Sequence, residues 1–458
     1  MDAITFGTDG WRATLDEFTA ERVRIVGQAV ADYLREEGPD ERTVAVGYDA
    51  RAHSRGFAEE LARVLAANGF DVLLSDRDVP TPATAWAIYE RGLAGGLVVT
   101  ASHNPPEYNG VKFFPSDAAP AMPEVTDAIA DRLAEPDPLP ESEWGSVEEA
   151  DFLDPHVEHC LDLVDADLEG LTVVYDAMHG SGREATPEAL ERAGADVIRR
   201  RCEHDPEFGG GAPEPGPENL RGLAADVREH GADLGLANDG DADRIALATP
   251  DRGFLDENLF FAALYEYLLA EESGPAVRSV STTFLIDRIA AAHDEEVIEV
   301  PVGFKWVARA MADHDALIGG EESGGFTVRG HIREKDGVLM ALYAAAAAAD
   351  EPLDSRVDRL LADHGEVHQG KVSVDCPDDR KEGVLDALEA DIPDVVADTE
   401  IEDVATMDGF KLLLVDGSWI LTRPSGTEPK MRVYAEASSQ ERVEELLAAG
   451  RSLVEPLV

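Results

Sequence analysis

Short apolar runs alternate with helix-like stretches along most of the chain. Residues 44–47 and 72–74 are apolar runs of strand length, and the amphipathic stretch 57–68 between them predicts a helix closed by Gly69. Alternation of this kind predicts βαβ units and largely parallel sheets.

The same rhythm returns further along the chain. A strand is expected at 171–175 with a helix after Pro187, and another strand at 279–283. The alanine run 344–349 predicts a helix. Near the C-terminus the alternation gives way to a shorter segment with strand signals at 371–374 and 412–415, which predicts an α+β unit.

Three stretches have the composition of boundaries. Residues 134–150 are rich in Pro, Glu, Asp and Ser and predict a linker, and further boundaries are expected near 251–256 and 363–370. The fold class expected is therefore α/β, with three α/β domains of mixed, largely parallel sheets and a smaller C-terminal α+β domain around a central cleft. The domains are placed at 1–150, 151–253, 254–366 and 367–458.

Four apolar runs each end in a polar, Gly-rich or acidic loop. Ligands of open α/β sheets gather just beyond the carboxyl ends of strands, so four such loops, one per expected domain, indicate one shared cleft. The runs and loops are 97–99 before 100–105, 234–237 before 239–244, 316–318 before 319–325, and 419–421 before 422–430.

The second loop offers three alternating carboxylates, Asp239, Asp241 and Asp243. An EF-hand would require glycine at the sixth position and glutamate at the twelfth, where this chain has Arg244 and Pro250, so that interpretation fails. Three carboxylates leave open positions on a hard cation, which suits Mg²⁺ bound together with a phosphate. An acidic surface turn is the alternative, and Arg244 directly after the triplet favours the phosphate site.

The first loop carries a candidate nucleophile, Ser102, followed by His103. The surrounding residues do not form a GxSxG elbow, so ordinary hydrolase chemistry has little support. A plain turn serine is the alternative. Downstream, the Asn109-Gly110 turn presents Lys112, which could shuttle a proton or contact phosphate.

The other two loops combine donors and acceptors for a phosphorylated sugar. Glycine backbone, hydroxyls and a guanidinium in the last loop predict a phosphate cradle, and carboxylates of the third loop could accept hydrogen bonds from sugar hydroxyls. A plain turn is the alternative for each. The residues concerned are Arg423, Ser425, Gly426, Thr427 and Lys430 in the last loop, and Glu321, Glu322 and Ser323 in the third, with Gly303 and Lys305 upstream of it.

Residues 180–185 match the GxGxxG/A pattern of dinucleotide-binding sites. Asp176 to His179 separate the strand from the first glycine, whereas the fingerprint belongs in the tight turn itself. We therefore expect an ordinary βα turn.

The charge balance is unusual. The 458 residues include 94 acidic and 39 basic side chains, a formal net charge of −55, which argues against nucleic-acid and anionic-membrane partners. Acidic residues are spread through the chain, so an acidic surface is expected rather than a disordered tail. Because self-repulsion is screened at high ionic strength, we expect adaptation to a high-salt, halophilic cytoplasm.

The remaining composition is ordinary. The three cysteines, Cys160, Cys202 and Cys376, are far apart and show no CxxC spacing, so they are predicted to be structural thiols. No apolar stretch approaches the ~20 residues that a membrane span needs, and no basic-then-apolar leader follows Met1, so a cytoplasmic protein is expected.

Together, these motifs resemble the α-D-phosphohexomutase superfamily, which includes phosphoglucomutase and phosphomannomutase. The resemblance spans the whole chain, with the motifs in the family's order. It is carried by Phe6-Gly-Thr-Asp-Gly-Trp-Arg12, Thr100-Ala-Ser102-His-Asn-Pro105, Asp239-Gly-Asp241-Ala-Asp243-Arg244, Gly320-Glu-Glu-Ser323-Gly324 and Arg423-Pro-Ser425-Gly-Thr427-Glu-Pro429.

The resemblance implies a phosphoprotein enzyme that interconverts hexose 1-phosphate and hexose 6-phosphate, an isomerase of carbohydrate metabolism. Ser102 would carry the phosphoryl group, with one Mg²⁺ between its phosphate and the three aspartates, and a hexose 1,6-bisphosphate would be intermediate and activator. Arg12 and Arg244 would contact the phosphoserine region, with His103 and Lys112 near the transferred group. Glu321 and Ser323 would bind sugar hydroxyls, and Arg423, Ser425, Gly426 and Thr427 the other phosphate.

The substrate sugar is less sharply indicated. Residues 301–305 and 331–337 are similar to the phosphoglucomutase branch, and Gly325 stands where many phosphomannomutase-type relatives carry a histidine. Glucose is therefore expected, with mannose or glucosamine as alternatives. A metal-dependent sugar phosphatase, or a sugar-phosphate-binding protein without catalysis, are the rivals from other classes.

Overall fold

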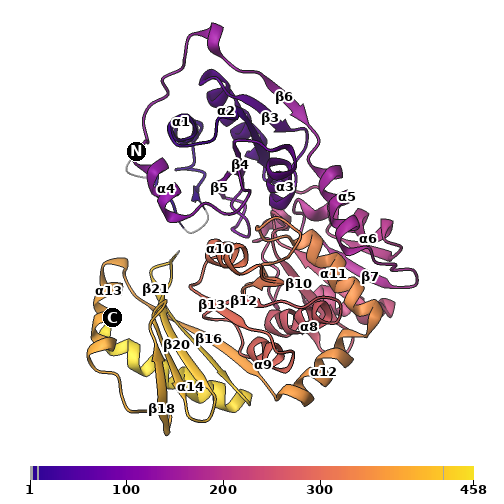
Figure 1. The fold of residues 1–458 in the computed structure, drawn as a ribbon, viewed down its shortest axis with the longest axis vertical. Coiled ribbons are helices and arrows are strands. Elements are labelled where there is room, and N and C mark those ends of the chain that lie inside the picture. The colour runs from indigo at the N-terminus through magenta and orange to yellow at the C-terminus, as the bar shows by residue number, and fades with distance from the viewer. Residues whose placement is uncertain (1–3, 8–9, 427) are drawn as a thin grey trace. The chain divides into compact units, whose positions relative to one another are not determined.

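The computed structural model describes residues 4–7, 10–426 and 428–458 (Figure 1). The chain divides into two compact units, one made of residues 1–260 and 323–354 and the other of residues 261–322 and 355–458. Two helices, α8 (Glu257–Leu269) and α12 (Leu353–His364), contain points at which the chain passes from one unit to the other. Each unit is described by itself.

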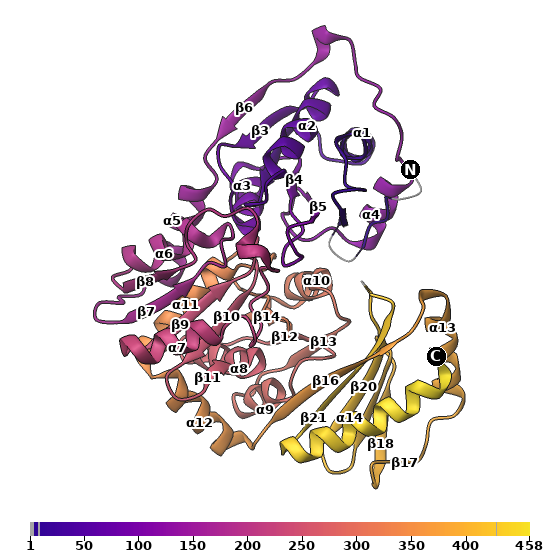
Figure 2. The same cartoon turned by 180° about the vertical axis from the view of Figure 1, so that it is seen from behind.

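The first sheet of unit 1 has the order β1-β5-β4-β2-β3-β6. Its strands β3, β4, β5 and β6 are labelled in Figures 1 and 2. Its strands β2, β3, β4 and β6 run parallel, and β5 and β1 add an antiparallel edge. The elements are β1 (Trp11–Thr14), α1 (Ala20–Glu36), β2 (Thr43–Tyr48), α2 (Ser54–Ala67), β3 (Asp71–Ser75), α3 (Thr81–Arg91), β4 (Gly95–Val99), β5 (Tyr108–Pro115), α4 (Pro123–Ala130), η1 (Glu141–Glu143) and β6 (Val147–Ala150).

The second sheet of unit 1 has the order β11-β10-β9-β7-β8, again parallel at one side and antiparallel at the other. Helix α11 packs beside α5 and α6 in the same unit. The elements are α5 (Leu153–Val164), β7 (Thr172–Asp176), α6 (Gly182–Arg192), β8 (Asp196–Arg200), η2 (Phe208–Gly210), α7 (Arg221–His230), β9 (Leu234–Asn238), β10 (Ile245–Thr249), β11 (Gly253–Leu255) and α11 (Gly337–Asp350). Residues Phe326–Val328 form β15, which is not a strand of this sheet.

Unit 2 contains a parallel sheet in which β12 lies between β13 and β14, and an antiparallel sheet with the order β16-β21-β20-β19-β18-β17. The elements of the first are β12 (Ala276–Ser279), α9 (Leu285–Ala292), β13 (Val297–Val300), α10 (Phe304–His314) and β14 (Ile318–Gly320). Those of the second are β16 (His368–Asp375), α13 (Asp378–Ala390), β17 (Val395–Val396), β18 (Thr399–Ala405), β19 (Phe410–Leu414), β20 (Trp419–Pro424), β21 (Lys430–Ala437), α14 (Gln440–Val454) and η3 (Glu455–Leu457).

The two sheets of unit 2 share a buried contact. Trp419, Leu421 and Tyr434 of the antiparallel sheet pack with Val280, which follows β12. The ammonium group of Lys411, on β19, donates to the Val280 carbonyl at 2.8 Å and to Glu299 Oε2 at 2.7 Å. The Lys411 side chain is buried and Glu299 is partly exposed, and the C-terminal sheet is therefore tied to the preceding α/β sheet by apolar packing and by a buried lysine charge.

The expected fold class, α/β domains with a C-terminal α+β domain, is confirmed. Strands 44–47, 72–74 and 371–374 lie inside β2, β3 and β16, and the alanine run is helical in α11. Several predicted first and last residues of helices and strands were wrong, because they depend on contacts that a sequence pattern does not show.

Three elements have other bounds than expected. Helix α2 begins at residue 54 rather than 57, and α6 begins before Pro187, which lies inside it and removes only one backbone donor. The strand expected at 279–283 ends at residue 279, where the hydroxyls of Ser279 and Thr282 bond to each other at 2.8 Å in a turn.

Two loop assignments were also wrong. The end of the expected linker 134–150 is an edge strand, β6, which pairs with β3 although two of its four residues are acidic. The strand expected at 316–318 is β14 at 318–320, and β20 continues to residue 424, so that Arg423 lies in a strand rather than in the loop. In both cases a neighbouring strand supplies the pairing that the local sequence does not predict.

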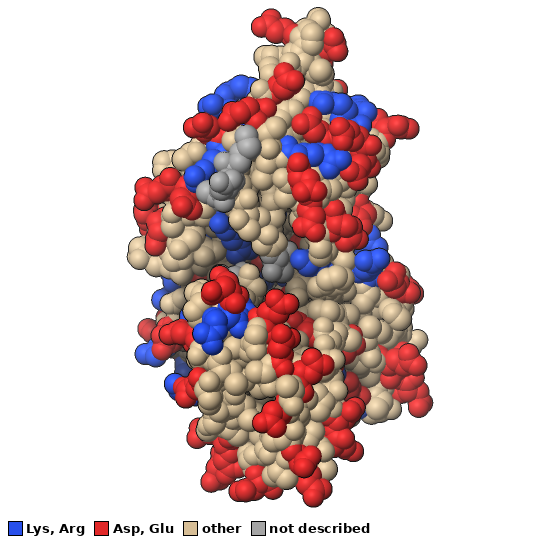
Figure 3. Space-filling model, turned by 90° about the vertical axis from the view of Figure 1, so that its left-hand side faces the viewer, with Lys and Arg blue, Asp and Glu red and all other residues tan. Residues whose placement is uncertain are grey.

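Two features of composition can be followed in the structure. Acidic side chains are scattered over the face drawn in Figure 3, in keeping with the expected acidic surface. None of the helices within the described ranges is long and apolar enough to cross a membrane.

Candidate active site

Ser102 lies in a buried turn just after β4. Its side chain is almost fully buried, its backbone has a left-handed φ of 52°, and its N–H donates to Thr100 Oγ1 at 2.8 Å. A left-handed backbone is unfavourable for a residue with a side chain, so the surrounding contacts must stabilise this turn.

Arg51, which follows β2, supplies those contacts. Its guanidinium donates to the carbonyls of Ser102 at 2.7 Å, Asn104 at 2.6 Å, Pro105 at 2.7 Å and Tyr108 at 3.1 Å. All of these carbonyls belong to the serine loop or the residues that leave it. One buried side chain therefore fixes the path of the whole loop.

A carboxylate orients this guanidinium in turn. Asp49 Oδ2 accepts from Arg51 Nε at 2.9 Å and from Thr100 Oγ1 at 2.7 Å, while Asp49 Oδ1 accepts from Ser54 Oγ at 2.5 Å. The side chains of Asp49 and Arg51 are at most 1% exposed. A charge pair buried to this degree is stable only because each partner is fully hydrogen-bonded.

The three aspartates follow β9 and lie against the serine loop. Asp239 Oδ2 accepts from Ser102 Oγ at 2.9 Å. A Cβ atom on Gly240 would lie only 2.5 Å from the Ser102 carbonyl oxygen, so glycine permits this close approach of the two loops. Thr81 Oγ1 donates to Asp241 Oδ2 at 2.7 Å and fixes that carboxylate.

Lys112, on β5, is a buried cation between two of these carboxylates. Its Nζ lies 2.8 Å from Asp241 Oδ2 and 2.7 Å from Asp243 Oδ2. Burial alone would lower the pKa of Lys112, but the two carboxylates raise it above its usual value. A proton shuttle needs a pKa near the working pH, so Lys112 in this arrangement supplies positive charge instead.

The aspartates differ in charge. Burial, with Asp243 and Asp241 nearby, raises the pKa of Asp239 well above its usual value. Burial acts in the same direction on Asp243, but Lys112, Lys335 and Arg244 outweigh it and hold the pKa of that carboxyl well below its usual range. The triplet therefore carries less than its full negative charge until a further cation compensates it.

His103 faces the candidate nucleophile. Its Nδ1 lies 3.2 Å from Ser102 Oγ. The charge of Arg244, burial and the charge of Arg12 together lower the pKa of His103 to about 2, so the imidazole is neutral near pH 7. Arg12 itself, on β1, donates to Asn104 Oδ1 at 3.2 Å.

The aspartate cluster has the properties of a divalent-cation site. One oxygen atom from each of Asp239, Asp241 and Asp243 lies within 4.8 Å of the others. Asp241 Oδ1 and Asp243 Oδ1 are buried and find no hydrogen-bond donor among the described residues. Buried carboxylate oxygens without donors are costly unless a cation satisfies them, and oxygen-only donor sets suit Mg²⁺.

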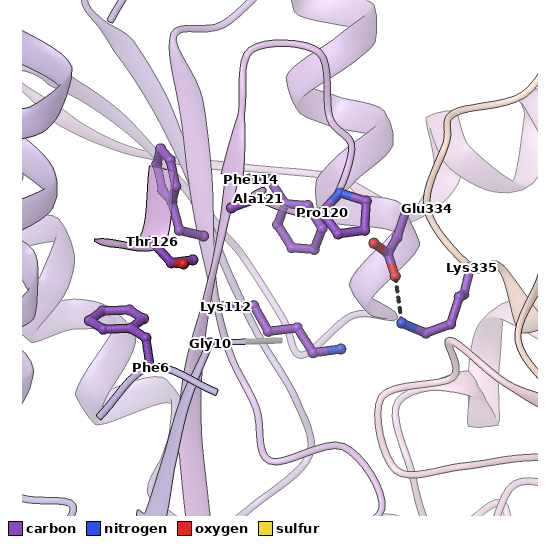
Figure 4. Close-up of a pocket in the computed structure, with 10 residues that line it drawn as sticks. Phe6, Gly10, Lys112, Phe114, Pro120, Ala121, Thr126, Glu334 and Lys335 are labelled. Carbon is purple, nitrogen blue, oxygen red and sulfur yellow. Dashed lines mark ion pairs between the residues drawn. The ribbon is translucent and has the colours of Figure 1, made fainter. Parts of the chain in front are cut away.

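Lys335 is a second buried lysine beside the cluster. Its Nζ lies 3.4 Å from Asp243 Oδ2 and 3.1 Å from Glu334 Oε1. A Cβ atom on Gly325 would lie 2.3 Å from Lys335 Cδ, so the lysine stem fills the space next to this glycine. Figure 4 shows Lys112 and Lys335 extending toward each other at one side of a pocket that Phe6, Phe114 and Pro120 also line.

Unit 2 brings together a second group of the expected site residues. Glu321 Oε1 accepts from the Gly303 N–H at 2.7 Å. Asp408 Oδ2 accepts from the Val302 N–H at 3.0 Å and from Arg423 Nε at 2.9 Å. Asp408 therefore connects the 302–303 turn to the strand that carries Arg423.

The remaining predicted residues are distributed as follows. Lys381 donates to the carbonyls of Ser425 at 2.6 Å and Glu428 at 2.7 Å and so braces the last loop. Gly426 is exposed in that loop, and Thr427 lies outside the described residues. Lys305 is on α10 in unit 2. Ser323, in contrast, is an exposed residue at the start of the returning segment of unit 1.

Sequence reasoning missed three residues that support these groups: Asp49, Arg51 and Asp408. The first two could have been found, because they directly follow a predicted strand, which is the signal that located the other loops. Asp408 acts through contacts with distant segments, and no local pattern marks it. Lys335 belongs to the 331–337 segment that the sequence analysis singled out, but its contact with Asp243 could not be predicted.

Models of four domains of one family match the chain in order. They are the phosphoglucomutase/phosphomannomutase alpha/beta/alpha domains I, II and III, at residues 3–139, 150–253 and 256–364, and the C-terminal domain at residues 372–451. The chain belongs to the phosphoglucomutase/phosphomannomutase family. The resemblance to the α-D-phosphohexomutase superfamily is thereby confirmed.

Named relatives in this family differ in their sugar. The chain is 35% identical to a Methanopyrus kandleri protein named "Probable phosphoglucosamine mutase", over 96% of this chain and 95% of that one. It is 32% identical to a phosphoglucomutase/phosphomannomutase of Thermococcus kodakarensis, over 98% of both chains, and 33% identical to a phosphopentomutase of that organism, over 99% of this chain and 98% of that one.

Solved structures share the fold. A phosphoglucomutase/phosphomannomutase family protein from Burkholderia thailandensis superposes with a TM-score of 0.85 at 24% identity, covering 100% of this chain and 98% of that one. A structure of Aspergillus fumigatus N-acetylphosphoglucosamine mutase in complex with GlcNAc-6P and magnesium superposes with a TM-score of 0.61 at 14% identity, covering 99% and 96%.

Proposed function

We propose that this family member is a phosphohexomutase, an intramolecular phosphotransferase that interconverts hexose 1-phosphate and hexose 6-phosphate. One observation carries the proposal: Ser102 Oγ lies 2.9 Å from Asp239 Oδ2, within a cluster of three buried aspartates and a buried lysine. A hydroxyl placed beside a cation site and a fixed positive charge is suited to carrying a phosphoryl group.

The reaction follows from these residues. Phosphorylated Ser102 would donate its phosphoryl group to the free hydroxyl of a hexose phosphate. The sugar oxygen forms the new P–O bond, the bond to Ser102 Oγ breaks, and the hydroxyl proton is taken up by a base. His103, 3.2 Å from Ser102 Oγ, would contact the transferred group as a neutral hydrogen-bonding partner, because a pKa of about 2 is too low for it to hold that proton near pH 7. The resulting 1,6-bisphosphate turns end for end, and its other phosphate returns to Ser102.

Asp239, Asp241 and Asp243 would hold one Mg²⁺. Bound there, the ion would neutralise charge on the transferred phosphoryl group. Lys112 and Arg244 add fixed positive charge to the same region, and Arg12 braces the serine loop through Asn104. A catalytic amount of hexose 1,6-bisphosphate would act as activator by phosphorylating Ser102.

The second group of residues would bind the rest of the substrate. Arg423, Ser425, Gly426 and Thr427 would contact the phosphate that is not reacting, and Gly303, Lys305, Glu321 and Ser323 the sugar hydroxyls. Arginine and backbone donors accept a phosphate in more than one orientation, which a turning intermediate requires. Domains at 1–150, 151–253, 254–366 and 367–458 would each contribute one loop.

The substrate proposal favours glucose phosphate. The Lys335 stem fills the space beside Gly325, the position at which this chain departs from phosphomannomutase-type relatives. A coupled assay on glucose, mannose, glucosamine and pentose 1-phosphates in parallel tests the proposal, and intact mass reports phosphorylation at Ser102. Release of inorganic phosphate without formation of the isomer would identify a phosphatase instead and refute the mutase.

The aspartate site leads to a measurable metal dependence. In Asp241→Asn, the Mg²⁺ concentration for half-maximal activity should rise about tenfold or more, because one of three anionic ligands becomes neutral. Titration of activity with MgCl₂ after removal of metal by a chelator measures this shift. Asp313→Asn, at an exposed position, is the matched control and should titrate like the wild type. Equal titrations for all three proteins would exclude these carboxylates as ligands.

We also propose that the acidic surface is an adaptation to a high-salt cytoplasm. The cytoplasmic location is itself still a prediction from the sequence. With a formal net charge of −55, self-repulsion should lower stability at low ionic strength and should be screened at ~2 M KCl, where the Debye length is below ~3 Å. The melting temperature is therefore expected to rise by about 10 °C or more between ~0.1 and ~2 M KCl. Equal melting temperature and activity in both buffers would refute the adaptation.

A further inference from the structure

A second cluster of potential ligands lies in unit 1, apart from the aspartate triplet. His156 Nε2 lies 2.6 Å from Asp336 Oδ2, and His331 Nε2 lies 2.9 Å from the same oxygen. Cys160 Sγ lies 3.5 Å from His156 Nε2 and 3.9 Å from Asp336 Oδ2. Ligand atoms of His156, His331 and Asp336 therefore all lie within 4.8 Å of one another, and the Cys160 sulfur lies beside two of them.

Two short segments supply these side chains. His156 and Cys160 are four residues apart on α5 and so share one face of the helix. His331 and Asp336 belong to the loop before α11, and Asp336 Oδ1 also caps that helix by accepting from the N–H groups of Val338 and Leu339, both at 2.9 Å. The side chains of His156, His331 and Asp336 are 0% exposed.

We propose that His156, Cys160, His331 and Asp336 form a structural site for a transition-metal ion, with Zn²⁺ as the preferred occupant. Imidazole, thiolate and carboxylate together match zinc rather than the hard cations Mg²⁺ and Ca²⁺, which take oxygen ligands. The three mutually close ligands are His156, His331 and Asp336, and the neighbouring Cys160 thiolate would supply the fourth ligand of a tetrahedral shell, which is typical of a structural ion rather than a catalytic one.

The distances are compatible with this assignment. Ligand atoms of a tetrahedral zinc ion lie roughly 3.3–3.6 Å apart. The separation of Cys160 Sγ from His156 Nε2 already has this value, and Asp336 Oδ2 lies slightly further from the sulfur. The two contacts between histidine and Asp336 are shorter because they are hydrogen bonds, and an ion would displace the two protons and widen each contact by about half an ångström.

The surroundings of the cluster also fit a metal site. His331 Nδ1 pairs with His159 Nε2 at 2.9 Å, and the His159 ring stacks on Trp86 with 3.6 Å between the ring centroids. An outer partner on the second ring nitrogen is what orients a ligating histidine.

The ion would directly connect α5 and the 331–336 loop of unit 1. It would be linked to α3 indirectly, because Trp86 of α3 stacks on His159, which pairs with His331. That loop continues into Gly337, whose N–H donates to the Ala242 carbonyl at 3.1 Å, and it carries Lys335 beside Asp243. A metal at this cluster would thus stabilise the position of a cation at the proposed active site without taking part in the reaction.

Metal analysis of the purified protein tests the site. The full chain is desalted in buffer containing excess Mg²⁺, which occupies the aspartate triplet, and its metals are measured by mass spectrometry. About one zinc per chain is expected for the wild type and for Cys202→Ala, and about tenfold less for His156→Asn and Cys160→Ala. Zinc below about a tenth of an equivalent in the wild type, even after loading with ZnCl₂, would overturn the proposal.

Cobalt provides a readout that depends on sulfur. Co²⁺ added to the metal-free wild type should give a thiolate-to-cobalt charge-transfer band, which the aspartate triplet cannot produce because it contains no cysteine. The band should persist in Asp241→Asn and in Cys202→Ala and disappear in Cys160→Ala. Absence of the band in the wild type, or its persistence in Cys160→Ala, would contradict the assignment. Because the wild type alone gives this spectrum, the test does not depend on the folding of the His156 variant.

Discussion

Ser102→Ala is expected to lose at least about 10⁴-fold in kcat while remaining folded. The hydroxyl is the proposed carrier of the phosphoryl group, and its hydrogen-bond partners among the described residues are Asp239 and His103. Removing it abolishes the covalent step but deletes few packing contacts. The coupled mutase assay measures the loss, and intact mass should show that the variant cannot be phosphorylated by hexose 1,6-bisphosphate.

Ser373→Ala is the matched control for this experiment. Ser373 is an exposed residue of β16, so its replacement should leave activity and mass shift unchanged. A Ser102→Ala variant with more than about a tenth of wild-type activity would show that phosphate does not pass through this serine. The proposed mechanism would then be wrong even if the protein were a mutase.

Arg51→Met is expected to destabilise the fold by about 3–5 kcal/mol and to lower kcat as well. The substitution keeps most of the side-chain volume but removes the donors to four carbonyls of the serine loop and leaves the Asp49 carboxylate buried without its counter-charge. Because Ser102 has a left-handed backbone conformation, loss of these donors should also let the loop relax away from Asp239. Denaturant unfolding in molar KCl and the mutase assay measure the two effects.

Arg55→Met provides the comparison. Arg55 is on the first turn of α2, is about half exposed, and pairs with Glu59 and Glu149 at the surface. Exposed pairs contribute about 0–1 kcal/mol, so this variant should unfold almost like the wild type and retain full activity. If the two arginine variants behaved alike, Arg51 would not be the residue that organises the loop.

The sequence predicted most of the architecture because its strands and helices are strongly patterned. Buried strands such as β2 and β9 are continuous apolar runs, and the polar residues that follow them were located by that contrast. The aspartate triplet and Ser102 were therefore named, and the structure places them within hydrogen-bonding distance. The same motifs also indicated the family to which the chain belongs.

What the sequence could not predict depends on long-range contacts. The sequence of β6 has the composition of a linker, and its pairing with β3 is what makes it a strand. The convergence of His156 and Cys160 with Asp336 joins residues about 180 positions apart, so a search for closely spaced cysteines missed it. Lys112 was expected to move a proton or contact phosphate, but Asp241 and Asp243, whose approach a sequence does not reveal, raise its pKa.

Asp408 is a single carboxylate that accepts hydrogen bonds from the 302–303 turn and from Arg423. The turn proposed to recognise the sugar and the strand proposed to recognise its distant phosphate therefore share a common support. A mutation that moves the 302–303 turn to fit a new substrate will therefore also move Arg423. Redesign of sugar preference in this chain should vary Gly303, Asp408 and Arg423 together, because their effects will not be additive.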